Sequence, residues 1–254
     1  HVAADSHVDN SISTPVPFVK NNIDSTLHIL EYARNLPNLE KFVYFSTDEV
    51  YGSAPLGKYY KEGDRFNCGN PYSASKAAAE CICQAYSNTY RMPIIVTNTM
   101  NVIGQRQHPE KFVPKVIKKV LNDEVVTIHS NEEKTKAGSR FYIHARNIAD
   151  ALLHILDNCD EVLDNYDAAA GKFNIVGEKE TDNLQLAQLI ASNLGKELKY
   201  EMVDFHSQRP GHDLRYAMDG EKMKNLGWVH PILFEDSLSD TIEWTLKRKE
   251  WLEI

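Results

Sequence analysis

The sequence lacks the features that would direct the chain to a membrane or to a nucleic acid. No apolar run approaches the roughly 20 residues that a membrane-spanning helix requires, and no charged leader followed by an apolar stretch opens the chain. Lysine and arginine form no basic run, and the formal net charge is −8. Such a charge disfavours a polyanion as the main partner. We expect neither a membrane nor a nucleic acid to be a partner.

Cysteines are few, and their positions suit neither a disulfide framework nor a zinc site. The sequence has four, Cys68, Cys81, Cys83 and Cys159. Cys81 and Cys83 lie two residues apart in an expected helix, so they point to different faces, and no matching pair occurs elsewhere. The ten histidines show no spacing typical of metal ligands. We therefore expect reduced thiols, a cytoplasmic protein and no bound metal.

A glycine-rich turn that binds a dinucleotide pyrophosphate is also missing from the start of the chain. The first residues, His1-Val2-Ala3-Ala4, have the pattern of the end of a sheet strand, and we expect a polar loop to follow through Asp9. Because a parallel strand–helix–strand unit takes about 30 residues or more, we expect roughly 70 residues to precede this segment in the natural protein.

What the sequence does contain is a strand that ends in a polar tip. Phe42-Val43-Tyr44-Phe45 is a short unbroken apolar run of the kind that a parallel sheet buries. Ser46-Thr47-Asp48-Glu49 follows it directly. In open α/β sheets, ligands bind at the carboxyl ends of the strands, so this tip is a candidate functional site. The alternative is a solvated acidic loop tip.

A helix that begins near Asn70-Pro71 supplies the second part of the candidate site. Asparagine is a favoured capping residue, and proline is favoured at the first helical position. Tyr72 and Lys76 lie four residues apart and share one face of this helix. A phenol with a pKa of about 10 is a poor base at neutral pH, and we expect the nearby ammonium to lower the pKa of Tyr72. The alternative is a surface tyrosine with a neighbouring lysine.

The order of the expected elements indicates an α/β protein. Along the first half, a helix from Phe18 to Asn35, a strand at 41–46, a helix from Pro71 to about Tyr90 and a strand at 93–97 alternate. Such alternation is typical of a Rossmann-like, doubly wound parallel sheet. With 254 residues, the chain has room for one such domain and a smaller C-terminal substrate lobe.

The second half is expected to form that lobe, interleaved with the sheet domain. We assign 1–104 to the remaining part of the sheet domain, with 140–157 returning to it, and 105–139 and 158–254 to the lobe. A helix capped by Thr181 or Asp182 should end before Gly195. The other expected elements are helices at 112–121, 147–156, 219–226 and 234–249, and strands at 125–128, 141–143 and 173–176.

Several motifs give the chain a close resemblance to a known family. The matching segments are His1-Val-Ala-Ala-Asp-Ser-His-Val-Asp9, Ser46-Thr-Asp-Glu-Val-Tyr-Gly52, Pro71-Tyr-Ser-Ala-Ser-Lys76, His108-Pro-Glu-Lys-Phe-Val-Pro114 and Arg209-Pro-Gly-His-Asp-Leu-Arg-Tyr216. In order and spacing they resemble the extended short-chain dehydrogenase/reductases, and specifically the nucleoside-diphosphate-glucose 4,6-dehydratases. The match spans nearly the whole chain, and the tract 130–139 is longer than usual.

The resemblance implies a reaction and the residues that carry it. In that family, NAD oxidises C4 of a nucleotide-activated glucose, water is lost across C5–C6, and hydride returns to C6. The product is a 4-keto-6-deoxy sugar used for rhamnose and other deoxysugars. By resemblance, Tyr72 with Lys76 takes the C4 proton, Thr47 hydrogen-bonds the C4 oxygen, Glu49 is the base at C5, and Asp48 is the acid for the C6 hydroxyl. The residues implied at the NAD cofactor are Ala3, Ala4, Ser46, Tyr72, Lys76 and Thr99.

The resemblance also implies a set of substrate residues, namely His7, Asn101, Glu110, Lys111, Phe112, Arg140, Arg209 and His212. Arg209 and His212 would approach the diphosphate, since a guanidinium suits phosphate oxygens. Met100, His129 and Gly138-Ser139 depart from the family pattern, and Arg140 would replace the displaced arginine. These departures leave the nucleotide open between dTDP and UDP.

Two other functions remain open from the sequence. A 4-epimerase or decarboxylase could use the same scaffold, although neither needs Asp48 and Glu49 to remove a C6 hydroxyl. If the chain natively lacked its first part, a catalytically impaired sugar-nucleotide-binding protein would be the alternative. By resemblance, we expect a homodimer in which helices 18–34 and 71–90 pack against their mates as a four-helix bundle.

Overall fold

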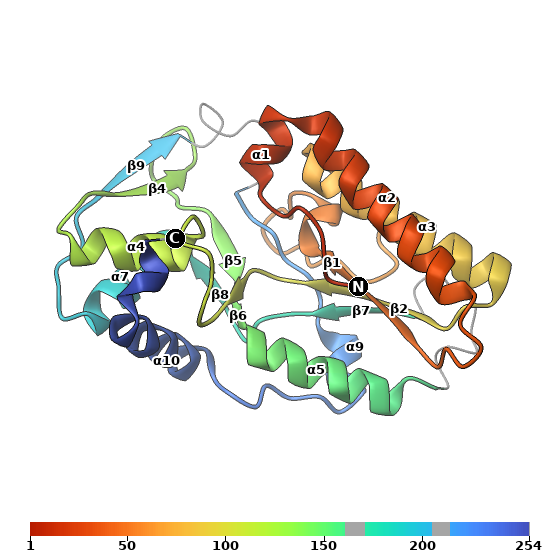
Figure 1. Ribbon diagram of the computed structural model, residues 1–254. Coiled ribbons are helices and arrows are strands. Elements are labelled where there is room, and N and C mark those ends of the chain that lie inside the picture. Colours follow the sequence, from red (N-terminus) through yellow and green to blue (C-terminus); the bar gives the residue numbers. More distant parts are fainter. Residues whose placement is uncertain (161–170, 205–213, 254) are drawn as a thin grey trace. The chain divides into compact units, whose positions relative to one another are not determined.

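The computed structural model describes residues 1–160, 171–204 and 214–253, which form two compact units (Figure 1). Unit 1 comprises the described residues of 1–99, 151–175 and 214–229, and unit 2 comprises those of 100–150, 176–204 and 230–253. These boundaries differ from the predicted domain boundaries, because 140–150 belong to unit 2 whereas 171–175 and 214–229 belong to unit 1. The physical reason is that a strand at 172–175 pairs with the sheet of unit 1.

Unit 1 is built on a parallel sheet, as the sequence predicts. Its strands are β1 (Phe42–Thr47), β2 (Ile94–Thr99) and β7 (Lys172–Ile175), in the order β1-β2-β7. Both pairs are parallel, and the register of the first places Ser46 beside Asn98 and Thr47 beside Thr99. The polar carboxyl ends of β1 and β2 therefore meet at one edge of the sheet.

Helices cover this sheet. α2 (Pro15–Arg34) and α3 (Pro71–Tyr90) lie side by side, and α3 packs on β1 and β2 (Figure 1). The second half of α5 (Ala145–Asn158) also belongs to unit 1. α2 buries Phe18, Leu30 and Ala33, in agreement with the predicted amphipathic helix. Unit 1 also contains the 3₁₀ turn η1 (Asp48–Tyr51) and the short helix α9 (Glu221–Asn225).

The first residues fold differently from the prediction. The expected polar loop contains a short helix, α1 (Val8–Ser13), which packs against α2 and α3. Its polar sequence is poor in strong helix formers, so these tertiary contacts, with Val8 and Ser11 buried, account for it. Residues 1–4 have no assigned strand, but the carbonyl of His1 accepts a hydrogen bond from the Phe45 N–H at 3.1 Å, so this segment lies along β1.

α3 has its predicted bounds because local chemistry specifies both ends. Asn70 Oδ1 accepts from the Ser73 N–H at 2.9 Å, and Ser73 Oγ accepts from the Asn70 N–H at 3.2 Å, which is a reciprocal capping box. Pro71 occupies the first turn, where its missing N–H costs nothing. Arg91, with a φ of 57°, ends the helix in the left-handed conformation.

Unit 2 contains short strands in separate pairs. β3 (Val102–Ile103) pairs with β6 (Ile143–His144) and β4 (Val126–Ser130) with β9 (Tyr200–Asp204), both parallel, while β5 (Ser139–Phe141) pairs antiparallel with β8 (Glu180–Asp182). The strand expected at 141–143 is thus two strands in different pairs. β8 and β9 escape prediction because they are too short or too polar for a clear alternation.

The helices of unit 2 are α4 (Phe112–Leu121), α7 (Asn183–Asn193) and α10 (Phe234–Lys247), followed by the 3₁₀ turn η2 (Lys249–Leu252). α7 begins as predicted, because Asp182 Oδ1 accepts from the Gln185 N–H at 2.8 Å. Of the helices in the described ranges, none is both long and apolar enough to cross a membrane.

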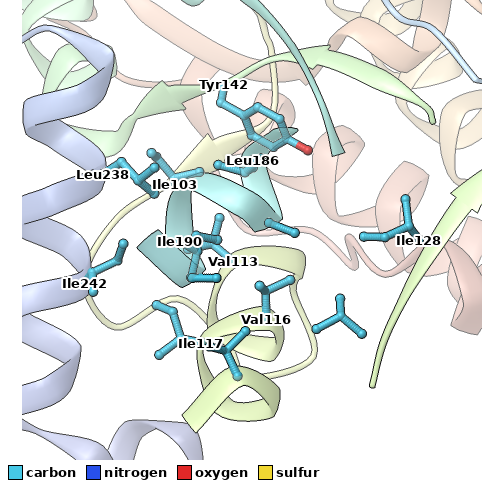
Figure 2. Close-up of a cluster of buried hydrophobic side chains, with 14 of the residues drawn as sticks. Ile103, Val113, Val116, Ile117, Ile128, Tyr142, Leu186, Ile190, Leu238 and Ile242 are labelled. Carbon is cyan, nitrogen blue, oxygen red and sulfur yellow. The ribbon is translucent and has the colours of Figure 1, made fainter. Parts of the chain in front are cut away.

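An apolar cluster between these helices forms the core of unit 2 (Figure 2). α4 buries residues 113, 116, 117 and 120, the spacing of one helical face. Figure 2 shows Val116 and Ile117 of α4 with Ile190 of α7, Ile242 of α10 and Ile128 of β4, and all five are buried.

Ile117 is fully buried in this cluster, so replacing it with alanine would remove apolar contacts and leave a cavity. We expect Ile117→Ala to lower the free energy of unfolding by about 2–5 kcal/mol, measured by urea denaturation followed by circular dichroism. Val125 lies in the same unit and is 47% exposed. The control Val125→Ala should change the free energy by less than about 0.5 kcal/mol, and equal effects of the two substitutions would contradict the assigned core.

Candidate active site

The end of β1 turns directly into the acidic residues of the candidate site. Thr47 is the capping residue of η1, and its Oγ1 accepts from the Glu49 N–H at 3.3 Å. The same hydroxyl donates to Asp48 Oδ1 at 3.0 Å. Thr47 and Asp48 are buried, whereas Glu49 is partly exposed. The two neighbouring carboxyl groups therefore have different surroundings.

A glycine makes this tight turn possible. Gly52 ends η1 with a φ of 71°, a conformation that L side chains rarely adopt. A Cβ at this position would lie 2.2 Å from the carbonyl oxygen of Asn67, which is closer than any real contact. The chain can therefore pass close to residue 67 and direct Asp48 and Glu49 to the carboxyl end of the sheet.

The first turn of α3 brings Tyr72 to the same place. The Thr47 hydroxyl is close enough to the Tyr72 phenol to affect its pKa, and the Tyr72 ring meets the Phe18 ring edge-on, with the centroids 6.3 Å apart. Asn70, the capping residue of α3, donates from Nδ2 to Glu49 Oε2 at 3.2 Å. Unit 1 thus brings together Thr47, Asp48, Glu49 and Tyr72, as the sequence predicts.

The pKa of Tyr72 shifts in the direction opposite to the prediction. Burial raises the pKa of Tyr72 above its ordinary value, and the carboxylates of Glu49 and Asp48 raise it further, while the hydrogen bond with Thr47 opposes them. Within the described residues, Lys76 is not among the groups that shift it. The predicted lowering by the ammonium is therefore wrong for this structure.

The direction of the Lys76 side chain explains this correction. Its Nζ donates to the Phe45 carbonyl at 2.6 Å and lies 4.4 Å from the centre of the Tyr44 ring, so the ammonium contacts β1. Burial lowers the pKa of Lys76 to about 8, against the opposing effects of Glu80 and Cys83. Four-residue spacing placed Tyr72 and Lys76 on one face, but it does not specify a contact between them.

The other residues predicted at the cofactor lie near the strand ends or in the first segment. Ser46 Oγ donates to the Glu80 carboxylate, and Thr99 Oγ1 donates to the Ser46 carbonyl at 3.3 Å. Ala3 and Ala4 lie in the segment that precedes α1, together with His7, which is the capping residue of α1. Asn22 of α2 accepts from the Asp5 N–H at 2.7 Å and so fixes this segment to unit 1.

Most of the predicted substrate residues belong to unit 2. Asn101 and Glu110 are exposed, and Lys111 caps α4, which begins at Phe112. Arg140 is buried on β5 and donates from Nη1 to the Ser139 carbonyl at 2.6 Å. Arg209 and His212 lie outside the described residues, so their predicted role stays a prediction.

Sequence reasoning missed two groups of residues around the site. Tyr216 hydrogen-bonds to Glu49 Oε2 at 3.5 Å, although its motif had suggested only diphosphate contacts. Glu80 accepts from Ser46 and forms an ion pair with Lys172 at 2.8 Å. The position of Glu80, four residues after Lys76 on the same helix face, was an available signal. The sequence around Lys172 contains no comparable signal.

Comparison with known proteins supports the same fold and family. A family model described as GDP-mannose 4,6 dehydratase matches residues 1–241. The dTDP-glucose 4,6-dehydratase of Escherichia coli is 33% identical over 278 residues, which cover 99% of this chain and 74% of that enzyme. A trifunctional UDP-glucose 4,6-dehydratase/UDP-4-keto-6-deoxy-D-glucose 3,5-epimerase/UDP-4-keto-L-rhamnose-reductase of Arabidopsis thaliana is 33% identical over 255 residues. The match covers 99% of this chain and spans 36% of the plant enzyme's length.

Solved structures with the same fold include dehydratases and epimerases. DesIV, a dTDP-glucose 4,6-dehydratase from Streptomyces venezuelae solved with NAD bound, has a TM-score of 0.85 at 30% identity, covering 99% of this chain and 74% of that chain. The UDP-glucose 4-epimerase of Thermus thermophilus in complex with NAD has a TM-score of 0.85 at 25% identity, with 97% and 76% covered. The predicted Rossmann-like α/β fold is confirmed.

Burial of Lys76 leads to a prediction about stability. Its pKa is about 8 in the folded chain and about 10.4 in an unfolded chain. Between these values the unfolded state binds more protons than the folded state, so the free energy of unfolding rises with pH. Lys76→Met removes this group. We expect the wild type to gain about 1–3 kcal/mol relative to Lys76→Met between pH 8 and pH 10.5.

Urea denaturation of both proteins across this pH range would measure the difference, and other titrating groups cancel between them. Lys224→Met is the matched control, because Lys224 is an exposed lysine of unit 1. The free energy of unfolding of Lys224→Met should change with pH in the same way as that of the wild type. A difference between wild type and Lys76→Met that does not change with pH would show that Lys76 titrates normally.

Proposed function

Because the chain belongs to the GDP-mannose 4,6 dehydratase family, we propose that it catalyses the NAD-dependent dehydration of a nucleotide-activated glucose. The substrate would be dTDP-glucose or UDP-glucose, and the product the 4-keto-6-deoxy sugar. The observation that carries this proposal is the turn at the end of β1, where Thr47, Asp48 and Glu49 lie with Tyr72. The two carboxyl groups are what a dehydration needs beyond simple oxidation.

Tyr72 and Thr47 are the groups we assign to the C4 hydroxyl. The Thr47 hydroxyl lies close enough to the phenol to affect its pKa, so at the end of β1 Tyr72 would accept the C4 proton and Thr47 would hold the oxygen. NAD bound at this edge would supply the hydride acceptor for C4 and the hydride donor for C6, and the positive charge of its oxidised ring would favour the phenolate of Tyr72. Lys76, held at the Phe45 carbonyl, supports the position of this part of α3.

Asp48 and Glu49 are assigned to the loss of water. Glu49 would remove the C5 proton as a base, and Asp48 would protonate the departing C6 hydroxyl. Asp48 is buried beside the Thr47 hydroxyl, whereas Glu49 is partly exposed and accepts from Asn70. Enzymes commonly make one of two neighbouring carboxyl groups an acid and the other a base by giving them different surroundings.

The polar side chains at this edge of the sheet suit a nicotinamide dinucleotide. The hydroxyls of Ser46 and Thr99, the phenol of Tyr72 and the ammonium of Lys76 all lie around the carboxyl ends of β1 and β2, the usual place for such a cofactor. Among the described residues, one hydrogen bond, to Phe45, is made by the Lys76 ammonium. Its other donor hydrogens suit the hydroxyls of a ribose.

A 4-epimerase is the second candidate, supported by the fold shared with the Thermus thermophilus epimerase. Epimerisation at C4 has no use for an acid and a base at C5 and C6, so the turn favours dehydration. We further propose a cytoplasmic enzyme that serves the formation of rhamnose or other deoxysugars. For the role in deoxysugar formation, support comes from the dTDP-glucose 4,6-dehydratase and from the plant relative whose name includes UDP-4-keto-L-rhamnose-reductase.

The test incubates the full-length gene product with NAD⁺ and either dTDP-glucose or UDP-glucose and measures the product by mass. Loss of one water with one donor would support dehydration and identify the nucleotide. Asp48→Asn and Glu49→Gln should each lower kcat by about 10²–10⁴-fold, because each removes a proton-transferring group. Glu243→Gln, at an exposed glutamate of α10, is the matched control. An intact or merely epimerised sugar with the wild type would overturn the proposal.

We also propose that α2 and α3 form the interface of a homodimer. α3 exposes the small residues Ala74, Cys81 and Ala85 along one stripe, and α2 exposes Val16 and Leu27. Small residues let helices approach closely, and exposed apolar side chains on neighbouring helices favour burial against a partner.

Ala85→Arg would place a long charged side chain on this surface. We expect the wild type to sediment as a dimer at micromolar concentration and Ala85→Arg as a monomer, since an unpaired buried charge is costly at an interface. Leu153→Arg is the control, because Leu153 is an exposed apolar residue of α5. A monomeric wild type would contradict the proposed dimer.

A further inference from the structure

We propose that Glu80, Asn98 and Lys172 form a positioning cluster that holds the turn carrying Asp48 and Glu49 in its working geometry. The inference rests on the proposed dehydratase function of that turn. The three residues come from α3, β2 and β7, and all are buried. None is assigned to touch the reacting atoms, so their effect would act through Thr47 and Tyr51.

The carboxylate of Glu80 joins all three strands of the unit 1 sheet. It accepts from Ser46 Oγ of β1, from Asn98 Nδ2 of β2 at 2.8 Å, and it pairs with Lys172 Nζ of β7 at 2.8 Å. A buried charge is tolerated when it is paired and hydrogen-bonded. Glu80 meets both conditions, with one donor from each strand.

Asn98 connects this carboxylate to the catalytic end of β1. Its Nδ2 also donates to the Thr47 carbonyl at 3.0 Å. The two preceding carbonyls are held in the same way, since Lys76 donates to Phe45 at 2.6 Å and Thr99 to Ser46 at 3.3 Å. Three successive carbonyls thus accept side-chain hydrogen bonds immediately before Asp48. The backbone direction at the start of the turn is therefore determined by side chains of α3 and β2.

Lys172 reaches the other end of the turn. Its Nζ lies 4.7 Å from the centre of the Tyr51 ring and 4.6 Å from that of Phe66, close enough for attraction between a cation and an aromatic face. Tyr51 is the last residue of η1, and its hydroxyl donates to Asn174 Oδ1 at 3.2 Å. Asp48 and Glu49 are therefore held between two anchored residues, Thr47 and Tyr51.

Stability alone does not explain this arrangement. Replacing a buried ion pair with apolar side chains of similar volume is often neutral or stabilising. Apolar side chains could not, however, hold the Thr47 carbonyl through Asn98 or attract the Tyr51 ring. Burial lowers the pKa of Lys76, and the charge of Glu80 acts in the opposite direction by favouring the ammonium. Cys83 also raises this pKa. The contacts of Glu80, Asn98 and Lys172 therefore reach residues of the candidate active site rather than residues of the apolar core.

The test separates turnover from binding. Lys172→Met and Glu80→Gln should lower kcat by about 10- to 100-fold, because displacing a catalytic group by about 1 Å can cost about 10²-fold. The KM for the nucleotide sugar should stay within about threefold, since no substrate contact is removed. Lys172→Arg keeps both the charge and the contact with the ring, and should restore kcat to within about fivefold of the wild type.

Hydrogen–deuterium exchange of residues 46–51 gives a readout that does not depend on activity. Exchange there should become about tenfold faster in Lys172→Met, because the turn loses one anchor. Lys247→Met is the control for both measurements, since it breaks an exposed ion pair on α10. If the wild type acts on neither sugar nucleotide, the proposed function fails, and exchange alone decides whether the cluster positions the turn.

A buried charge left without its partner could prevent folding of the single variants. The double variant Glu80→Gln/Lys172→Met leaves neither charge, and it would then be measured in their place. The proposal is overturned if the folded variant retains wild-type kcat and wild-type exchange at 46–51. It is also overturned if the loss lies wholly in KM, or if lower thermal stability accompanies an unchanged kcat, since a merely structural role predicts that result.

Discussion

The parallel register of β1 and β2 is the constraint on which the rest of unit 1 depends. It places Ser46 beside Asn98 and Thr47 beside Thr99, so polar side chains gather at one edge of a sheet that helices cover. Burying them requires partners. The carboxylate of Glu80 supplies a partner to all three strands. The edge of the sheet where ligands usually bind is therefore held by hydrogen bonds between the protein's own groups.

Much of this arrangement was predictable because local chemistry specified it. Asn70 and Pro71 begin α3 at the expected residue, and the capping box explains why no tertiary information was needed. The apolar run of β1 and its polar tip likewise predicted a strand with a candidate site at its carboxyl end. α1 was not predictable, since its polar sequence forms a helix through contacts with α2 and α3.

Contacts between side chains were harder to predict than the elements that carry them. Helical spacing placed Tyr72 and Lys76 on one face, but rotamers decide where each side chain goes, and Lys76 extends to the Phe45 carbonyl. Sequence order did not indicate that Lys172, nearly a hundred residues beyond Glu80 in the chain, would become its ion-pair partner. Pairing of β7 with β2 brings the two together, and that pairing is a long-range property of the sheet.

The two shifted pKa values have a consequence for how the proposed chemistry starts. Burial and the carboxylates of Glu49 and Asp48 raise the pKa of Tyr72, while burial lowers the pKa of Lys76 to about 8. On raising the pH without ligands, the ammonium therefore loses its proton before the phenol does. In the proposed mechanism, Tyr72 would therefore act as a base once the positive charge of bound NAD⁺ offsets the effects of burial and of the carboxylates. An interaction that forms only with the reacting groups in place can stabilise the transition state more than the ground state, which is the condition for faster chemistry.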